Sequence, residues 1–256
     1  MDPNLIIGGS SLVLTGIGTW AGVAAVRSQR PPTVIGAIDP RPARNVLDQR
    51  VKDHSNSKVL EILARFVFVS HQGPIVVGAL DQFRITLFLD LFSAATVPRY
   101  RDRISNLIVD HIRQVIQDRE QPHYVAVPKE GNVLLADAVA RKLRTRLIVI
   151  RTMIPAIRFG DPVEGPFASG ACVVIVDDIA SDGELLVRTA GHVRTHGGRV
   201  SLCVCAVERK DGNSRERLAE HQVELSVPIE LDEQTLRDLA RLPNSPMQQI
   251  HSEDQP

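Results

Sequence analysis

The stretch that decides the fold is residues 171–186, which read A-C-V-V-I-V-D-D-I-A-S-D-G-E-L-L. A run of apolar residues leads directly into two carboxylates, Asp177 and Asp178. A continuous run rich in β-branched residues is typical of a strand that is buried on both faces of a parallel sheet. A short turn with Ser181 and Gly183 follows, and apolar residues then recur at helical spacing. The stretch therefore predicts a strand, an acidic pair, a small-residue turn and a helix.

The predicted turn lies where the helix begins. The first N–H groups of a helix have no partner inside the helix, and they lie at the positive end of its dipole. A helix N-terminus that follows a strand in this way is a ready phosphate site. The sequence thus brings two carboxylates and a candidate phosphate-binding turn to one end of one strand.

Composition limits the classes of function. The 256 residues allow one large domain or two small ones, and apolar residues make up 43%, which is enough for a sizeable core. The formal net charge is zero, which argues against a broad nucleic-acid footprint and against a polybasic membrane patch. The three cysteines, at positions 172, 203 and 205, lie in apolar runs and are too few for a zinc site, so we expect buried free thiols.

The N-terminal segment reads as a membrane anchor. Residues 5–26 carry no charge and are followed at once by Arg27 and Arg30. A helix needs about 20 apolar residues to cross a bilayer, and basic residues after the span place the remaining chain in the cytoplasm. We therefore expect a single-pass helix in the cell (inner) membrane, after a short tail at residues 1–4. Gly18 and Gly22 form a GxxxG pair that can bring two such helices together.

Two other interpretations of this segment stay open. The run is rich in glycine, so it also suits a buried or disordered arm. A cleaved signal peptide is favoured less, because the chain starts Met-Asp-Pro-Asn, which is acidic where a signal peptide is basic.

The rest of the chain divides into a linker, a body and a tail. Residues 27–56 contain four prolines and many polar residues, which predicts a linker with one short strand at 33–38. Residues 57–242 alternate helical and strand patterns, and residues 243–256 are polar and are expected to be disordered.

Strands that alternate with helices predict an α/β fold, a doubly wound and mostly parallel sheet that binds ligands beyond the carboxyl ends of its strands. The helices that we expect are at 57–67, 102–117, 131–143, 183–195, 215–221 and 233–242. The strands that we expect are at 75–80, 85–92, 124–127, 147–151, 172–176, 200–207 and 223–229.

The central stretch resembles the phosphoribosyl pyrophosphate (PRPP) loop of the type I phosphoribosyltransferases. That pattern is four apolar residues, two acids, two variable residues, Ser or Thr, a variable residue and Gly, as in V-V-I-V-D-D-I-A-S-D-G here. The resemblance implies that Asp177 and Asp178 hold the ribose hydroxyls. It also implies that a loop wraps the 5′-phosphate, with residues Ala180, Ser181, Asp182, Gly183, Glu184 and Leu185.

The resemblance is closest to orotate phosphoribosyltransferases and covers about residues 57–242. Residues 124–143, Y-V-A-V-P-K-E-G-N-V-L-L-A-D-A-V-A-R-K-L, look like the family's pyrophosphate-loop strand and helix, and residues 75–92 occupy the place of the hood over the base. Val-Glu-Arg at 207–209 resembles an apolar-acid-Arg segment whose arginine contacts the base, which implies base contacts for Arg209 and, from the loop, Ser181.

In this family Mg²⁺·PRPP reacts with a nitrogenous base to give a nucleotide and pyrophosphate. The ribose C1 carbon becomes oxocarbenium-like in this reaction. The protein's main task is therefore to hold the phosphates and the magnesium ion in place while charge develops. Asp177 and Asp178 would also bind Mg²⁺, through PRPP or water. The resemblance places four further residues near the pyrophosphate: Lys129, Glu130, Gly131 and Arg151. A solvated turn lysine and a solvated strand-end arginine are the alternatives for Lys129 and Arg151.

The chain departs from the family in the segment that follows residue 151. Orotate phosphoribosyltransferases carry there a mobile loop with several lysines and a His-Gly pair that stabilises the leaving pyrophosphate. Here no lysine occurs between Lys142 and Lys210, and Arg158 is the only cation in residues 152–162. A guanidinium binds phosphate well, so Arg158 substitutes in part for those lysines and is the third catalytic candidate. Because the other loop cations are missing, orotate turnover by the family's route is not expected to be efficient.

The phosphate loop itself also departs from the family. Asp182 and Glu184 stand where the family has small neutral residues. At an effective dielectric of about 20, two like charges about 4 Å apart repel by roughly 4 kcal/mol, which would weaken phosphate binding. Glu184 suits the first turn of a helix because an acid complements the helix dipole. The sequence offers no such explanation for Asp182.

Three hypotheses follow from these observations. The first is a membrane-anchored phosphoribosyltransferase whose base need not be orotate, and a variant of it consumes nucleotides in reverse or by hydrolysis. The second is a sensor or regulatory module that binds PRPP or a nucleotide with catalysis impaired. The third is a scaffold that keeps the fold alone, which the acidic pair and Gly183 argue against. Enzymes of this family are usually dimers, so we expect a homodimer.

Overall fold

The structure is a computed structural model that describes residues 54–69, 75–77, 83–152 and 161–242. The expected membrane span at 5–26, the short strand at 33–38 and the tail at 243–256 lie outside the described residues. Within the described ranges, none of the helices has both the length and the apolar character that crossing a bilayer requires.

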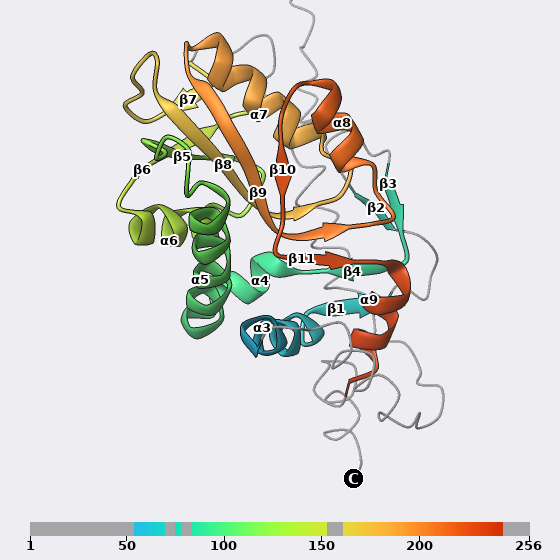
Figure 1. Cartoon of the computed structure of the whole chain (residues 1–256). Coiled ribbons are helices and arrows are strands. Elements are labelled where there is room, and N and C mark those ends of the chain that lie inside the picture. Colours follow the sequence, from blue (N-terminus) through green and yellow to red (C-terminus); the bar gives the residue numbers. More distant parts are fainter. Residues whose placement is uncertain (1–53, 70–74, 78–82, 153–160, 243–256) are drawn as a thin grey trace, which may run out of the picture. The chain divides into compact units, whose positions relative to one another are not determined.

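A mostly parallel sheet organises the fold (Figure 1). Its strands follow the order β10-β9-β8-β5-β6-β7, and β11 also pairs with β9. All neighbours are parallel except β6 and β7. This confirms the predicted α/β class. The strands are β5 (Tyr124–Pro128), β6 (Arg146–Ile150), β7 (Val163–Glu164), β8 (Cys172–Ala180), β9 (Arg199–Arg209), β10 (Leu225–Ser226) and β11 (Ile229–Leu231).

Helices cover both faces of the sheet, and alternate strand residues separate into two cores. On one face, Val174 and Val176 of β8 pack in a cluster with α5 (Pro98–Val115) and α6 (Val133–Leu143). On the other face, Val173 and Ile175 pack with α7 (Glu184–Thr195) and α8 (Ser214–Glu220). Because strand side chains alternate between faces and both faces are covered here, residues 172–176 of β8 are all apolar, and the acidic pair comes only after them.

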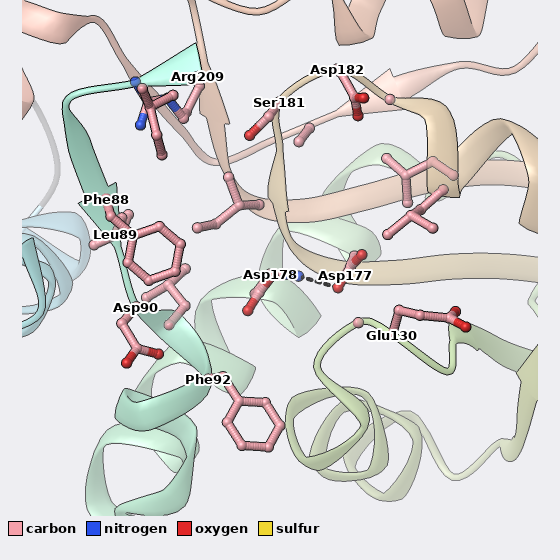
Figure 2. Close-up of a pocket in the computed structure, with 18 residues that line it drawn as sticks. Phe88, Leu89, Asp90, Phe92, Glu130, Asp177, Asp178, Ser181, Asp182 and Arg209 are labelled. Atoms are coloured by element: carbon pink, nitrogen blue, oxygen red, sulfur yellow. Dashed lines mark hydrogen bonds between the residues drawn. The ribbon is translucent and has the colours of Figure 1, made fainter. Parts of the chain in front are cut away.

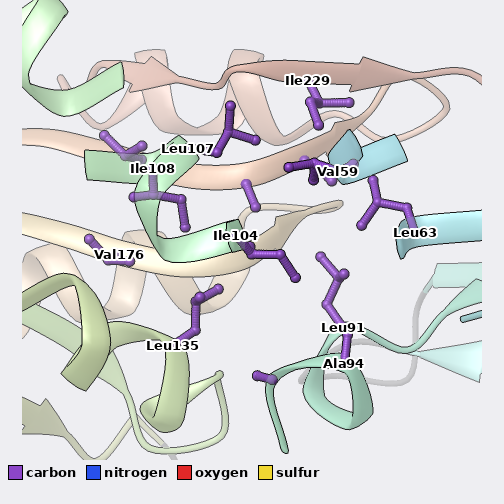
Figure 3. Packing of buried hydrophobic residues seen from close by; sticks show 14 of the residues in the cluster. Val59, Leu63, Leu91, Ala94, Ile104, Leu107, Ile108, Leu135, Val176 and Ile229 are labelled. Carbon is purple, nitrogen blue, oxygen red and sulfur yellow. The ribbon is translucent and has the colours of Figure 1, made fainter. Parts of the chain in front are cut away.

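The largest core lies on the face covered by α5. Ile104, Ile108 and Ile112 of this helix are fully buried, and they recur at the helical spacing that the sequence predicted. Figure 3 shows residues of α5 together with Val59 and Leu63 of α3 (His54–Ala64), and with residues of α4 (Leu91–Thr96), α6, β8 and β11. This core joins the sheet to the smaller elements at its edge.

Cys203 and Cys205 lie on the opposite face, in the cluster with α7 and α8. Both thiols are fully buried and free, as is Cys172. The prediction of buried, unpaired cysteines is therefore confirmed. Burial raises the pKa of both the Cys203 and the Cys205 thiol, so both stay protonated and unreactive.

A small hood lies beside the sheet. It has two antiparallel ribbons, β1 (Val67–Val69) with β4 (Leu87–Leu89), and β2 (Ile75–Val77) with β3 (Phe83–Ile85). The last helix, α9 (Glu233–Ala240), packs into the same core as α3 through Leu236 and Leu239. The ribbons β2, β3 and β4 lie within the predicted hood segment of residues 75–92, whereas β1 comes from the end of the helix expected at 57–67.

Several predicted elements needed correction. The helix expected at 57–67 is α3, which ends at Ala64, and Val67 begins β1, a strand that the sequence did not predict. The strand expected at 85–92 is divided, because β3 ends at Ile85 and β4 begins at Leu87. The strand expected at 85–92 is wrong beyond Leu89, because Asp90 accepts a hydrogen bond from the Ser93 N–H at 2.8 Å and starts helix α4 there. Helix α5 begins at Pro98 and not at 102, since proline suits the first helical position. The strand expected at 223–229 is two short strands, because Pro228 lacks the N–H that a ladder needs.

The strand order locates the ligand crevice. The chain runs from β5 outward to β6, and then returns to β8 on the other side of β5. In open α/β sheets, ligands bind beyond the carboxyl ends of the strands where the order reverses in this way. That point lies between the end of β5, at Pro128, and the last four residues of β8, which begin with Asp177 and Asp178.

Candidate functional site

The acidic pair lies at the carboxyl end of β8, facing the turn that follows β5. Asp177 is only 5% exposed, and its Oδ1 atom accepts hydrogen bonds from the backbone N–H groups of Asn132 at 3.1 Å and Asp178 at 2.9 Å. Asp178 is half-buried and lines a pocket. The structure therefore brings the acidic pair next to the turn of residues 129–132, three of which (129–131) the resemblance assigned to the pyrophosphate.

Asn132 connects these parts, and the sequence reading did not assign it a role. Its side-chain amide donates to Asp178 Oδ2 at 3.1 Å and to the Leu91 carbonyl at 3.2 Å. Its Oδ1 atom accepts from the Leu135 N–H at 3.1 Å and so caps α6. Asparagine immediately before an apolar helical run is a helix-start signal that marks this position in the sequence.

Two glycines allow the loops to approach each other. A Cβ atom on Gly131 would lie 2.6 Å from Asp177 Oδ1, so no larger residue fits without moving the acid. Gly183 has φ of +74°, a conformation that other residues adopt at a cost, and it begins α7. The predicted phosphate turn and the predicted pyrophosphate turn both depend on glycine at these positions.

The loops and the hood enclose a pocket of about 270 Å³. Figure 2 shows Phe88, Leu89, Asp90 and Phe92 on the hood side, across from Asp177, Asp178 and Glu130, with Ser181 and Asp182 nearby. Most of the predicted phosphate-loop and pyrophosphate-loop residues line it: Glu130, Gly131, Asp177, Asp178, Ala180, Ser181, Asp182, Gly183 and Leu185.

The pocket environment disfavours the ionised form of the acidic pair. Burial raises the pKa of Asp177 well above its usual range, and the neighbouring Asp178 charge raises it further. Burial also raises the pKa of Asp178, while the hydrogen bond from Asn132 opposes that shift. Carboxylates in this state gain from a cation or hydroxyl group that arrives in the pocket, because either one offsets the lost hydration.

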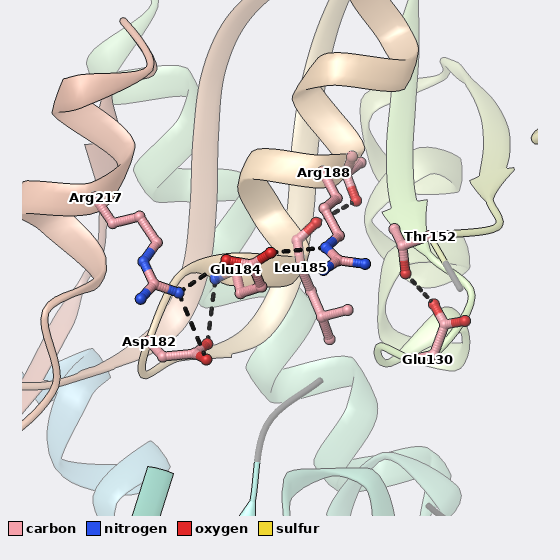
Figure 4. Close-up of polar contacts among 8 residues, drawn as sticks. Glu130, Thr152, Asp182, Glu184, Leu185, Arg188 and Arg217 are labelled. Carbon is pink, nitrogen blue, oxygen red and sulfur yellow. Dashed lines mark hydrogen bonds and ion pairs between the residues drawn. The ribbon is translucent and has the colours of Figure 1, made fainter. Parts of the chain in front are cut away.

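Arginine side chains compensate the two acids of the phosphate loop. These arginines explain how the loop can carry Asp182, for which the sequence offered no explanation. Glu184 forms ion pairs with Arg188 at 2.7 Å and with Arg217 at 2.9 Å, and Asp182 lies 3.8 Å from Arg217 (Figure 4). Asp182 Oδ1 also accepts a hydrogen bond from the Glu184 N–H at 3.2 Å. Two arginines thus neutralise the two acids, and the expected repulsion of a phosphate is reduced.

Arg217 comes from helix α8, and sequence reasoning did not assign it to the site. Residues 212–214 pack directly under the loop, since the Ser214 N–H donates to the Ser181 carbonyl at 3.1 Å. Helix α8 starts at Ser214, so its first turn carries Arg217 toward the loop. No sequence pattern links positions 182 and 217, and their pairing follows from the tertiary fold alone.

The predicted pyrophosphate cations are turned away from the pocket. Lys129 and Arg151 both approach Glu164, at 3.9 Å and 3.1 Å, and neither lines the pocket. Glu130 does line it, and its Oε2 atom accepts a hydrogen bond from Thr152 at 2.6 Å. Arg158 lies outside the described residues.

Arg209 lines the pocket from the end of β9, as its predicted base contact requires. It is 3% exposed, and its guanidinium donates to Asp211 at 2.5 and 3.0 Å and to the Leu87 carbonyl at 2.5 Å. The arginine therefore fixes the hood to the sheet. Its charge is largely balanced by Asp211.

The donor set suits a hard cation only in part. Carboxylate oxygens are the ligands that Mg²⁺ prefers, and Asp177 and Asp178 offer them at the pocket wall. No group of three or more potential metal ligands occurs among the described residues. A bound Mg²⁺ would therefore take most of its ligands from a substrate and water.

The fold defines a class of protein. An orotate phosphoribosyltransferase structure from Aeropyrum pernix is similar with a TM-score of 0.57 and 22% identity, over 71% of this chain and 98% of that chain. A Mycobacterium tuberculosis orotate phosphoribosyltransferase solved in complex with PRPP is similar with a TM-score of 0.53 and 17% identity, over 75% and 96% of the two chains. The chain has the phosphoribosyltransferase fold.

Sequence relatives point to one group within that class. An orotate phosphoribosyltransferase of Natronomonas pharaonis is 33% identical over 95 residues, or 37% of this chain and 54% of the relative. One of Methanocaldococcus jannaschii is 26% identical over 142 residues, or 56% and 76%. The chain is homologous to orotate phosphoribosyltransferases, although it spans only about half the length of the Natronomonas relative. No model of a known protein family matches the chain.

The raised pKa of the acidic pair predicts a pH-dependent stability. An acid whose pKa is raised by folding does not lower the free energy of unfolding while it is protonated in both states. It lowers that free energy increasingly as pH rises above the ordinary carboxyl range. Asp178→Asn keeps an acceptor for Asn132 but removes the charge. We expect it to stabilise the protein by roughly 1–2 kcal/mol at pH 8 and by much less at pH 4.5.

Urea unfolding at the two pH values measures this difference. The control is Asp118→Asn, because Asp118 is exposed and lies outside the pocket. The raised pKa of Asp178 would be contradicted if Asp178→Asn stabilised the protein equally at both pH values. It would also be contradicted if Asp118→Asn had the same effect.

The charge compensation by Arg217 predicts a coupled effect on phosphate binding. Arg217→Gln leaves Asp182 and part of the Glu184 charge uncompensated beside the loop. We expect PRPP to bind roughly tenfold more weakly, a modest loss because the ion pairs are partly exposed. The double variant Arg217→Gln/Asp182→Asn should recover most of the affinity, since it removes the exposed charge as well.

Isothermal titration of PRPP with Mg²⁺ into the four members of this double-mutant cycle gives the coupling. Arg237→Gln on α9, which breaks an ion pair with Glu233 away from the loop, serves as the matched control. Additive losses in the double variant would show that Arg217 acts in some way other than by neutralising Asp182.

Proposed function

We propose that the chain is a phosphoribosyltransferase that uses Mg²⁺·PRPP and a nitrogenous base to form a nucleotide and pyrophosphate. One observation supports this most: the pair Asp177 and Asp178, held by Asn132, faces a glycine turn at the point where the strand order reverses. The homology to orotate phosphoribosyltransferases agrees with it.

Each part of the substrate has a candidate partner. The ribose hydroxyls would lie against Asp177 and Asp178, whose raised pKa values favour a hydroxyl donor or a cation. The 5′-phosphate would lie in the turn of residues 180–185, at the positive end of α7. These contacts would fix the ribose while its ring carbon gains positive charge, and the nearby carboxylates would stabilise that charge.

Mg²⁺, when bound, would neutralise charge on the departing pyrophosphate. The residues of this chain that would hold it are Asp177 and Asp178, directly or through water and the ribose hydroxyls. Arg158 would supply the remaining cation for the leaving group, from the segment that follows Thr152. Lys129 and Arg151 would reach the pyrophosphate only by releasing Glu164.

The pocket favours a base other than orotate. Its described lining carries five carboxylates, Asp90, Glu130, Asp177, Asp178 and Asp182, against one cation, Arg209, which is already paired with Asp211. Arg217 compensates Asp182, and the raised pKa values of Asp177 and Asp178 reduce their charge. The described lining nevertheless offers a carboxylate-bearing base no cation apart from the paired Arg209. An uncharged pyrimidine or purine would suit the apolar hood surface of Ile85, Phe88, Leu89 and Phe92 better.

A second candidate function is a PRPP or nucleotide sensor whose catalysis is impaired. The acidic lining and the single loop cation, Arg158, favour it, because leaving-group stabilisation is weak in such a site. A sensor would bind PRPP saturably without releasing pyrophosphate.

The setting of this activity is also part of the proposal. Residues 5–26 would anchor the chain as a single-pass segment of the cell (inner) membrane, with the domain in the cytoplasm. The chain would act as a homodimer and would not bind nucleic acid.

A pyrophosphate-release assay with Mg²⁺, PRPP and a panel of bases tests the enzyme proposal. We expect release with at least one uncharged purine or pyrimidine, and a lower rate with orotate. Asp177→Asn/Asp178→Asn should lower kcat/KM by about 100-fold or more, as the loss of transition-state electrostatics does elsewhere. Asp118→Asn is the control.

The outcomes separate the two functions. Failure of every base to elicit release, while PRPP still binds, would reject the enzyme in favour of the sensor. Release that does not depend on Mg²⁺ or on the acidic pair would contradict the assigned site.

A further inference from the structure

A second pocket, separate from the acidic one, is lined by basic side chains. It has a volume of about 250 Å³ and lies between α3 and α5. Its lining consists of Lys58, Glu61, Ile62, Arg65, Arg99, Tyr100 and Arg103, and it shares no residue with the acidic pocket. Four cations and one acid give the groove a formal charge of +3 (four minus one) in a chain whose net charge is zero.

None of the four cations lies within 4.0 Å of a carboxylate of the described residues. Most lysine and arginine side chains of the described residues lie within 4.0 Å of a carboxylate, for example Lys142 with Asp102 and Arg199 with Glu120. Within the same ranges, no ion pair involves Lys58, Arg65, Arg99 or Arg103, although Glu61 lies in the same groove. Convergent like charges repel one another, so an anion that enters the groove relieves that repulsion.

The helix that carries two of these arginines increases the positive potential. Arg99 and Arg103 are four residues apart near the start of α5, so they lie on one helix face. The start of a helix is its positive end, and basic residues there oppose the dipole. The first turn of α5 has no acidic residue, and Asp102 in the next turn is paired with Lys142. The arrangement costs stability, and binding an anion offsets that cost.

The groove also has a directional hydrogen-bonding group. The Arg99 guanidinium lies 4.7 Å from the centre of the Tyr100 ring and donates to its hydroxyl at 2.9 Å. Phe66 packs edge-on against the same ring at 5.9 Å. Tyr100 is thereby held at the groove wall, where its hydroxyl and the arginine forks can bind the tetrahedral oxygens of a phosphate.

We propose that this groove binds a phosphate group, presented either by a small phosphorylated metabolite or by an anionic phospholipid headgroup. The groove offers hydrogen-bond donors and positive charge, and its described lining contains a single carboxylate. These groups suit the phosphate of a ligand and not a base that is attached to it. A dianionic phosphate carries more negative charge and more acceptor oxygens than a carboxylate does, so it can pair with two or three of the four cations at once. The groove is thus an anion site apart from the acidic pocket.

The chain offers a selective probe of this groove, because it contains only two tyrosines. Tyr100 lines the groove, while Tyr124 is buried in the sheet beneath Phe167. We would label the full chain with 3-fluorotyrosine and record fluorine NMR spectra during titration with inorganic phosphate and with inorganic pyrophosphate. We expect the Tyr100 resonance to shift saturably and the Tyr124 resonance to stay in place. Potassium chloride at equal ionic strength should move neither.

Charge-neutral variants test the residues. Arg65→Gln/Arg103→Gln should weaken the phosphate response of Tyr100 roughly tenfold or more, since two of four charge-assisted contacts are lost. Arg146→Gln is the matched control, because Arg146 is exposed and outside the groove. Its titration should match that of the unchanged protein.

Vesicles distinguish the two sources of phosphate. Tyr100 broadening with vesicles that contain phosphatidic acid, and none with pure phosphatidylcholine, would identify the headgroup as the ligand, whereas a response to soluble phosphate alone would identify a metabolite. The proposal is overturned if Tyr100 responds to none of these anions, if chloride acts as well as phosphate does, or if Arg65→Gln/Arg103→Gln responds as the unchanged protein does.

Discussion

The site depends on the hydrogen bonds that Asn132 makes to two adjacent carboxylates. Asp177 and Asp178 repel each other at a buried strand end, and burial makes their ionised forms costly. The backbone N–H of Asn132 binds Asp177 and its side-chain amide binds Asp178, while the same amide reaches the Leu91 carbonyl of the hood. One buried asparagine therefore joins the ends of β5 and β8 and the start of α4.

The close packing around the acidic pair also explains the glycines and the charged residues of the two neighbouring turns. Gly131 leaves room for Asp177, and Gly183 takes the left-handed conformation with which α7 begins. The extra acids in the phosphate turn are held by Arg188 and Arg217, so the turn keeps its shape with little net charge. The described lining of the pocket nevertheless carries five carboxylates and a single cation, Arg209.

Much of the fold follows from sequence alone. The apolar run before Asp177 predicts a central parallel strand, and the spacing of Ile104, Ile108 and Ile112 predicts the helix that covers it. These features are local, because strand and helix periods act over a few residues. The pattern of residues 85–92 predicts a strand through Asp90, because apolar residues surround it. Only the hydrogen bond from the Ser93 N–H to the Asp90 side chain shows that a helix begins there.

The contacts that complete the site are not local. Asn132 and Asp177 are 45 positions apart, and Arg217 and Glu184 are 33 apart. No periodicity connects such pairs, and the sheet order alone brings them together. The basic groove is of the same kind, since Lys58 and Arg103 meet only when α3 packs against α5. Sequence reading therefore located the acidic pair and the glycine turn that follows it, but not the residues that stabilise them.

The measurement that tests this account most directly is a phosphorus NMR titration of PRPP with the full chain, with and without Mg²⁺. If the two carboxylates and the turn of residues 180–185 form a phosphoribosyl site, the 5′-phosphate resonance of PRPP shifts saturably. Mg²⁺ should then strengthen binding, because it enters beside Asp177 and Asp178. Asn132→Ala should weaken the response. PRPP signals that stay unperturbed at every protein concentration would contradict the account.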